Sequence, residues 1–139
     1  MDLRFSGAEA SEAERAALDA VEAVAGPRGS RRHLLLPALH AIHDVTGWIS
    51  PGGMDEVARR LDVAPAEVYG VASFYALFSL RPRPSRVLHV CVDLACRLAG
   101  AERLVEEVTQ RCGPAGSEIG GGEAVGVPTA TWAESPCLG

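Results

Sequence analysis

The residues in this sequence best suited to chemistry are its cysteines, which stand at Cys91, Cys96, Cys112 and Cys137. A cysteine thiolate can bind zinc or iron. The first of the four ends a Val- and Leu-rich segment, residues 86–93, that reads as a strand. The second lies directly before a segment of helical periodicity. A loop between a strand and a helix is held at both ends, so we expect it to bring these two thiols to one point.

A third cysteine, Cys137, lies just past a second expected strand at about residues 124–132. If the two strands are parallel neighbours, they end at the same edge of the sheet, and Cys137 reaches the corner that holds the first pair. The helix expected at residues 98–112 begins at about Arg97. Its free amide groups and dipole would then favour an anion or thiolates at this corner.

The remaining cysteine, Cys112, lies sixteen residues after Cys96, at the far end of the expected helix. At ~1.5 Å per residue it is separated from that thiol by more than ~20 Å. A metal site needs its sulfur ligands at ~2.3 Å from the ion. We therefore expect Cys112 to be a buried small apolar residue rather than a ligand.

Spacing alone leaves two kinds of metal site open for the other three cysteines. The chain has 139 residues, of which 47% are hydrophobic and 22% charged, and its net charge is −5. No apolar run approaches ~18 residues, and the N-terminus lacks a secretory leader, so we expect a cytoplasmic protein without membrane insertion. Disulfides are rare in that compartment. Zinc and iron–sulfur both accept a Cys-x4-Cys pair, with iron–sulfur modestly favoured.

The net negative charge also disfavours nucleic acid as the main partner. Two other patterns are interpreted as structural. The histidines His40 and His43 have no further ligands at suitable spacing, and the glycines at 120–122 lack the Lys-Ser/Thr ending of a phosphate loop. His89 has the same strand parity as Cys91, so it can approach whatever that cysteine binds.

The rest of the chain predicts how these groups are positioned. Residues 1–30 read as a lead-in helix, which begins at a Ser11/Glu14 capping box and packs weakly because its apolar stripe is mostly alanine. Residues 31–80 read as a helical bundle whose later helices begin at Ser50-Pro51 and at Pro65. The linker is 81–85 (RPRPS), and 86–139 form a strand–helix–strand module. The expected fold class is α+β.

The order of motifs resembles a known family. Residues 66–75 read AEVYGVASFY, residues 89–101 read HVCVDLACRLAGA, and residues 137–139 read CLG. Over residues 31–139 the chain resembles the thioredoxin-like [2Fe–2S] component of NADH dehydrogenases, the 24-kDa or E-type subunits of respiratory complex I. The same module occurs in NAD-linked hydrogenases, in the gamma subunit of NAD-dependent formate dehydrogenases, and joined ahead of the flavin-bearing F-type subunit.

The resemblance implies an N-terminal helical bundle followed by a thioredoxin-like α/β domain that holds a [2Fe–2S] cluster. In that family the ligands are a Cys-x4-Cys pair and a later Cys-x3-Cys pair. The ligands carried over are Cys91, Cys96 and Cys137, and the fourth would stand two residues beyond Gly139. The resemblance thus implies a truncated module, or the front part of a fusion between the E-type and F-type chains.

The implied function is a one-electron relay within an NAD(H)-dependent oxidoreductase, such as an NADH dehydrogenase, a hydrogenase or a formate dehydrogenase. A partner flavoprotein of the F type would take hydride from NADH onto FMN, and the cluster would exchange single electrons with that flavin. The chain shows no catalytic residues of its own. It would lie in the cytoplasm, or at the periphery of the inner membrane as part of a complex. The alternative is a cluster-free structural module that docks onto the same flavoprotein.

Overall fold

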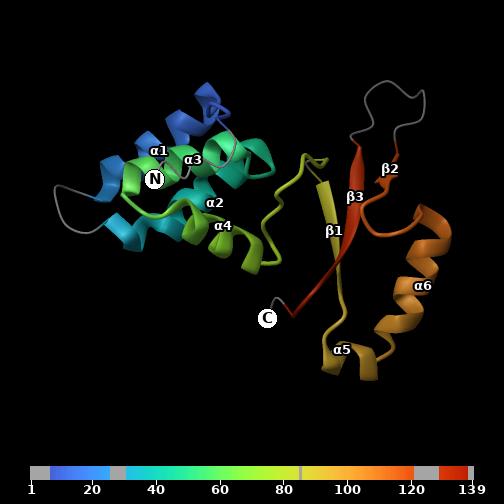
Figure 1. Cartoon of the computed structure of the whole chain (residues 1–139). Coiled ribbons are helices and arrows are strands. Elements are labelled where there is room, and N and C mark those ends of the chain that lie inside the picture. The colour runs from blue at the N-terminus through green and yellow to red at the C-terminus, as the bar shows by residue number, and fades with distance from the viewer. Residues whose placement is uncertain (1–6, 26–30, 85, 121–128, 138–139) are drawn as a thin grey trace. The chain divides into compact units, whose positions relative to one another are not determined.

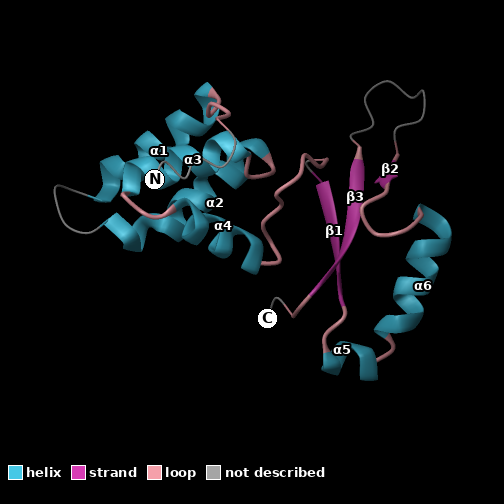
Figure 2. Ribbon diagram, viewed as in Figure 1, coloured by secondary structure: helices cyan, strands magenta, loops and turns pink. Residues whose placement is uncertain are grey.

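The computed structural model describes residues 7–25, 31–84, 86–120 and 129–137. The chain divides into two compact units, Met1–Pro82 and Arg83–Gly139 (Figure 1). The first unit is built of helices, and the second combines helices with a small sheet (Figure 2). The expectation of an α+β chain with an N-terminal helical region is confirmed.

The helices of the first unit begin where local signals place them. They are α1 (Glu12–Ala25), the 3-10 helix η1 (Arg31–Leu34), α2 (Leu35–Thr46), α3 (Pro51–Leu61) and α4 (Pro65–Phe74). The Ser50 hydroxyl accepts a hydrogen bond from the Gly53 amide at 2.8 Å and so caps α3. Proline is the first residue of both α3 and α4, where its missing amide hydrogen costs nothing.

Helix α1 packs on the rest of the helical unit through its thin apolar stripe. The side chain of Leu18 is buried in the core of the helical unit. One well-placed leucine therefore anchors the helix despite the alanines around it. The largest buried side chains of this core are Leu39, Ile42, Ile49, Val57 and Val68.

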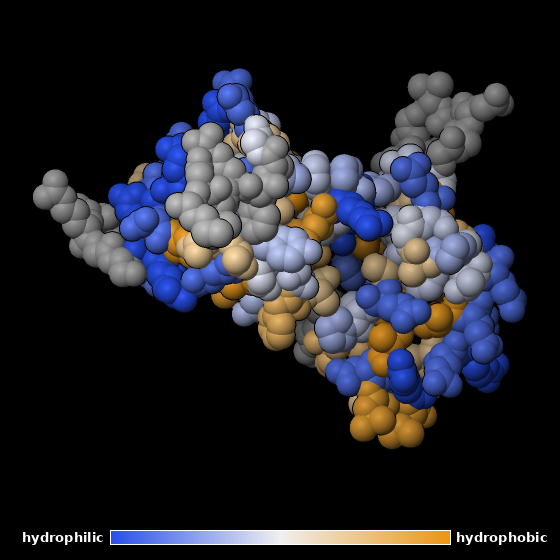
Figure 3. All heavy atoms as spheres, in the orientation of Figure 1, coloured by the Kyte–Doolittle hydropathy of each residue, from blue (hydrophilic) through white to orange (hydrophobic). Residues whose placement is uncertain are grey.

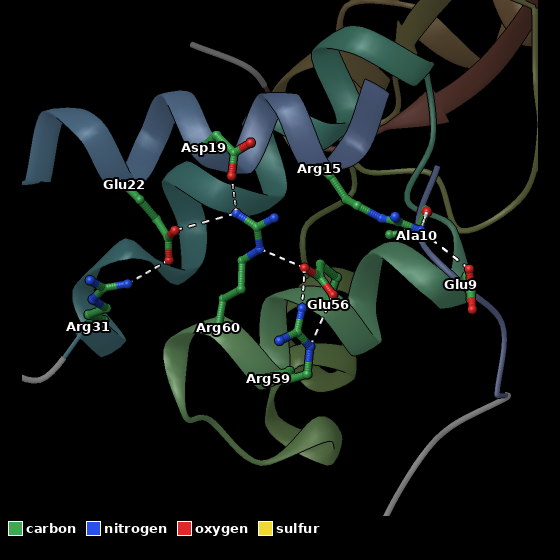
Figure 4. Close-up of polar contacts among 9 residues, drawn as sticks. All are labelled: Glu9, Ala10, Arg15, Asp19, Glu22, Arg31, Glu56, Arg59 and Arg60. Atoms are coloured by element: carbon green, nitrogen blue, oxygen red, sulfur yellow. Dashed lines mark hydrogen bonds and ion pairs between the residues drawn. The ribbon is translucent and has the colours of Figure 1, made fainter. Parts of the chain in front are cut away.

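A charged network joins α1 to α3 on the surface of this unit (Figure 4). The guanidinium of Arg60 donates to Asp19 at 2.5 Å and to Glu56 at 2.7 Å, and lies 3.4 Å from Glu22. Glu56 also accepts from Arg59. Arg60 thus bridges two helices that are some forty residues apart in the sequence.

We expect Glu56→Gln to lower the free energy of unfolding by about 1 kcal/mol at neutral pH, as for a partly exposed ion-pair network. The pKa of Glu56 is lowered from its ordinary 4.5, first by the hydrogen bond from Arg59 and then by that from Arg60, against the opposing effect of burial. A lowered pKa stabilises the fold above pH 4.5, and this stabilisation is lost as the pH falls through the folded-state pKa. Urea denaturation at neutral pH and at about pH 3 checks this. A stability difference of equal size at both values would contradict it.

Backbone crowding makes one glycine of α3 necessary. A Cβ built on Gly52 would lie 2.4 Å from the carbonyl oxygen of Glu9 and 2.8 Å from the amide nitrogen of Ala10. Both are backbone atoms, so they cannot move aside as a side-chain tip can. The segment before α1 therefore rests directly on the start of α3.

Gly52→Ala is expected to destabilise the helical unit by about 2 kcal/mol, because the added methyl group forces the two backbones apart. Gly70→Ala in α4 is the matched control, since a Cβ there meets nothing within 4 Å. The control should gain up to about 1 kcal/mol from better helix propensity. Thermal unfolding followed by circular dichroism measures both. Equal Tm values for the two variants would show that the contact at Gly52 is unimportant.

The second unit contains β1 (Arg86–Cys91), α5 (Leu94–Leu98), α6 (Ala101–Cys112), β2 (Glu118–Ile119) and β3 (Ala130–Ser135). The order in the sheet is β1-β3-β2. Strands β1 and β3 run parallel, as expected, and β2 pairs antiparallel with β3. On one face of β3, Trp132 is buried, and its indole nitrogen donates to the carbonyl of Gly113 just after α6 at 2.9 Å.

Three sequence expectations about this unit need correction. The helix expected at 98–112 begins at Ala101 as α6, because Gly100 just before it adopts φ 100°, a conformation that only glycine reaches easily, and the short helix α5 before Gly100 was not expected. The second strand continues to Ser135 instead of ending at Trp132, because it pairs with β1 along its whole length; residues 124–128 lie outside the described ranges. The short strand β2 was not expected. Of the glycines at 120–122, only Gly120 is described, with a positive φ of 70°.

Candidate metal centre

Two of the cysteines lie at the end of β1 and in the helix that follows it. Cys91 is the last residue of β1, and Cys96 lies in the middle of α5. Both are partly buried. The turn between them is short because α5 begins at Leu94, three residues earlier than the helix start expected at about Arg97. Arg97 consequently lies near the end of this five-residue helix. The prediction that a helix begins at Arg97, with its N-terminal amides and dipole at that residue, is therefore wrong.

Asp93 connects the first two cysteines to the third. Its carboxylate caps α5 by accepting from the amide of Leu94 at 2.7 Å through Oδ1. The other oxygen, Oδ2, accepts from the amide of Cys137 at 3.3 Å. One side chain thus holds together two segments that are 44 residues apart in the sequence. An Asp directly before a helix is a typical N-cap, but nothing in the sequence indicates its second bond.

The backbone holds the same corner together from the sheet side. Cys91 and Ser135 are register partners at the ends of the two parallel strands. Beyond them, the amide of Val92 donates to the carbonyl of Ser135 at 3.0 Å. The segment that follows β3 and carries Cys137 therefore starts next to the turn between Cys91 and Cys96, as the parallel arrangement predicts.

The groups around Cys96 change the pKa of its thiol. The pKa of Cys96 is raised above the ordinary thiol value, first by a hydrogen bond with the Cys91 thiol and then by slight burial. The negative charges of Cys91, Cys137 and Asp93 raise it further. This repulsion favours the protonated form of the Cys96 thiol in the metal-free chain, whereas metal ligation requires the thiolate.

In the described structure, the sulfurs of Cys91, Cys96 and Cys137 are not gathered into a metal site. Within the described ranges, no three His, Cys, Asp or Glu side chains lie close enough together to hold a metal ion. The donor set itself, all thiols at one end of a small sheet, is the type that zinc and iron–sulfur centres use. The side chain of Cys137 is exposed, so it can turn toward the pair without disturbing the core.

Cys112 lies apart from this corner, as expected, because it is the last residue of α6. It is only partly buried, so the prediction of a fully buried apolar residue is wrong. Ala101 is the buried residue of α6, and the rest of this helix, including its last residue, is more exposed.

Two side chains near the cysteines stand out because each has a buried polar atom without a hydrogen-bond partner. Among the described residues, these are His89 at Nδ1 and Ser135 at Oγ. The pKa of His89 is lowered by burial and by the positive charge of Arg83, which keeps the imidazole neutral. His89 is on the same face of β1 as Cys91, as the strand parity predicts.

The surface of α5 is strongly apolar. Its two leucines, Leu94 and Leu98, are 71% and 84% exposed. Figure 3 shows apolar side chains gathered over this helix. These exposed leucines lie on either side of Cys96 in the sequence of α5. In the described part of the chain, no helix combines the length and apolar character that a bilayer crossing requires.

Comparison with known proteins identifies the family. Residues 21–139 match the model of the thioredoxin-like [2Fe-2S] ferredoxin family. NADH-quinone oxidoreductase subunit 2 of Thermus thermophilus is 39% identical over 93 residues, which are 67% of this chain and 51% of that protein. The E-type subunit of the NADH-quinone oxidoreductase of Mycobacterium bovis is 31% identical over 99 residues, 71% of this chain and 39% of that one.

A eukaryotic relative matches over a longer stretch. NADH dehydrogenase [ubiquinone] flavoprotein 2 of Dictyostelium discoideum, a mitochondrial protein, is 32% identical over 114 residues, 81% of this chain and 44% of that protein. The chain thus spans about half the length, or less, of the relatives that it matches. Since the family model covers most of the sequence, including all four cysteines, the chain belongs to the thioredoxin-like [2Fe-2S] ferredoxin family.

Proposed function

We propose that this chain is an electron-transfer module in which Cys91, Cys96 and Cys137 hold a [2Fe–2S] cluster. The observation that carries the proposal is the corner at the ends of β1 and β3, where Asp93 holds the turn before α5 and the segment of the third cysteine together. When bound, the cluster takes up and releases one electron at a time. A fourth ligand must come from a residue other than these three, and Cys112 is excluded by its place at the end of α6.

The chain's own residues set the conditions at this corner. The thiolates supply the soft ligands that iron and sulfide require. Asp93 fixes the backbone at the amide of Cys137, so little freedom is lost when the third sulfur turns toward the first two. The apolar surface of α5 excludes water once a partner covers it, and burial of this kind influences the reduction potential.

We further propose that the partner is the NADH-oxidising flavoprotein of an NADH dehydrogenase, with NAD and FMN bound there rather than here. The relatives' names place them in NADH-quinone oxidoreductases. The exposed leucines of α5 lie beside Cys96, so a flavoprotein seated on them would have its flavin near the cluster. Association with a membrane complex would then be indirect, through that flavoprotein.

A second candidate is a cluster-free docking module of the same complex. The observation in its favour is that, over the described residues, no three donor side chains stand ready around a metal ion. The helical unit, with its own core, would then provide the binding surface.

Anaerobic reconstitution with ferrous iron and sulfide separates the two candidates. The electron-transfer module should bind about two irons and two sulfides per chain, absorb visible light and give an electron paramagnetic resonance signal on reduction. Mixing it with the NADH-reduced flavoprotein should bleach the visible absorption. A colourless, iron-free chain that still binds the flavoprotein would establish the docking module instead.

A further inference from the structure

Ser135 is the described residue near the cysteines whose burial is hardest to explain by the fold alone. The residue is 2% exposed, and its hydroxyl has no hydrogen-bond partner among the residues that the structure describes. A buried hydroxyl without a partner is costly, and such groups are rare in folded proteins. The last position of β3, a strand that also buries Thr131 and Trp132, would accept an apolar residue without this cost.

The sheet register places Ser135 beside Cys91 at the candidate centre. Ser135 is the register partner of Cys91, and partners on neighbouring parallel strands lie about 4.8 Å apart with their side chains on the same face. It also precedes Cys137 by two residues. The backbone at Ser135 is held in place, because the Ser135 carbonyl accepts a hydrogen bond from the amide of Val92.

We propose that Ser135 donates a hydrogen bond from Oγ to a sulfur of the bound cluster, either the Cys91 thiolate or a sulfide beside it. The inference rests on the proposed function. A hydroxyl aimed at an anionic sulfur forms a charge-assisted hydrogen bond, which is stronger than a neutral one. Reduction adds negative charge to the cluster, so the bond strengthens on reduction and raises the reduction potential. Ser135 is thus a positioning residue that adjusts the potential without being a ligand.

A redox titration followed by electron paramagnetic resonance tests the proposal on the reconstituted full chain. At the wild-type midpoint potential, Ser135→Ala should reduce the ratio of reduced to oxidised cluster about tenfold, which is a downward shift of about 59 mV for a one-electron couple. Ser135→Thr, which keeps a hydroxyl, should restore the wild-type value.

The matched control is Thr131→Val on the same face of β3. The Thr131 hydroxyl is also buried, but it already donates to the carbonyl of Ser117 at 2.8 Å and lies four residues from the cluster end. This variant should lose stability and keep the wild-type potential. An equal shift of the reduction potential in Ser135→Ala and in Thr131→Val would overturn the proposal, because the shift would then reflect general loosening of β3.

A measurement without the cluster completes the test. In the cluster-free chain, Ser135→Ala should unfold at the same urea concentration as the wild type or a higher one, because it removes an unpartnered polar group. A clear loss of stability would show that the hydroxyl has a structural partner, and would overturn the inference. Failure of the wild-type chain to take up iron would count against the proposed function instead, so the two failures are distinguishable.

Discussion

Replacing Cys96 by alanine is expected to abolish cluster binding. The variant removes the thiol of α5, so only the sulfurs of Cys91 and Cys137 are left at the corner. A [2Fe–2S] centre uses four protein ligands, and the variant leaves thiolates for only two of these positions, whereas the unchanged chain supplies three. We expect the iron bound after anaerobic reconstitution to fall from about two per chain to near zero, with loss of the visible absorption. Elemental analysis and absorption spectra measure this.

The chain offers a control of the same chemistry in Cys112. Cys112→Ala removes one thiol from the end of α6, away from the corner, and should leave the iron content unchanged. Cys137→Ala should behave like Cys96→Ala. If the control lost its iron and the Cys137 variant kept it, the assignment of the three ligands would be wrong.

Glu14→Ala should be the most destabilising of the substitutions in the helical unit, by about 3 kcal/mol. The carboxylate is almost fully buried, with 2% of the residue exposed. It accepts hydrogen bonds from the amide and hydroxyl of Ser11 at 2.7 and 2.9 Å, and from the Ser50 hydroxyl at 2.6 Å. Alanine leaves these donors without a partner at the start of both α1 and α3.

The comparison variant is Glu12→Ala, which removes an exposed carboxylate from the same first turn of α1. Its effect should stay below about 0.5 kcal/mol, as for most surface substitutions. Chemical denaturation followed by circular dichroism gives both values. Similar losses for the two variants would mean that the bond between Glu14 and Ser50 does not stabilise the packing of α1 on α3.

The pair of Glu14 and Ser11 illustrates what local sequence can predict. The capping box at the start of α1 forms as its spacing indicates, because both residues lie within one helical turn. The starts of α3 and α4 are likewise predicted by prolines and, for α3, by Ser50. The bond from Ser50 to Glu14, across 36 residues, has no signal in the sequence, because it depends on how the helices pack.

The same division holds at the candidate centre. The strand-like pattern of residues 86–93 and the position of Cys137 after a second strand predict parallel strands that end together, and the sheet confirms this. The start of α6 after Gly100 was missed, although a glycine in a helical pattern is a recognisable warning. The second bond of Asp93 and the isolation of the Ser135 hydroxyl arise only when β3 is placed beside β1.

By itself, the sequence determined the helical start points, the strand that ends at Cys91, and the motifs around the cysteines by which the family can be recognised. These depend on contacts within a few residues or on residue order, which a one-dimensional pattern retains. The tertiary structure alone decided that Asp93 holds the segment of Cys137 and that Ser135 is buried beside Cys91. Both follow from pairing between strands some forty residues apart, and the sequence pattern of either strand alone does not specify which side chains such pairing brings together.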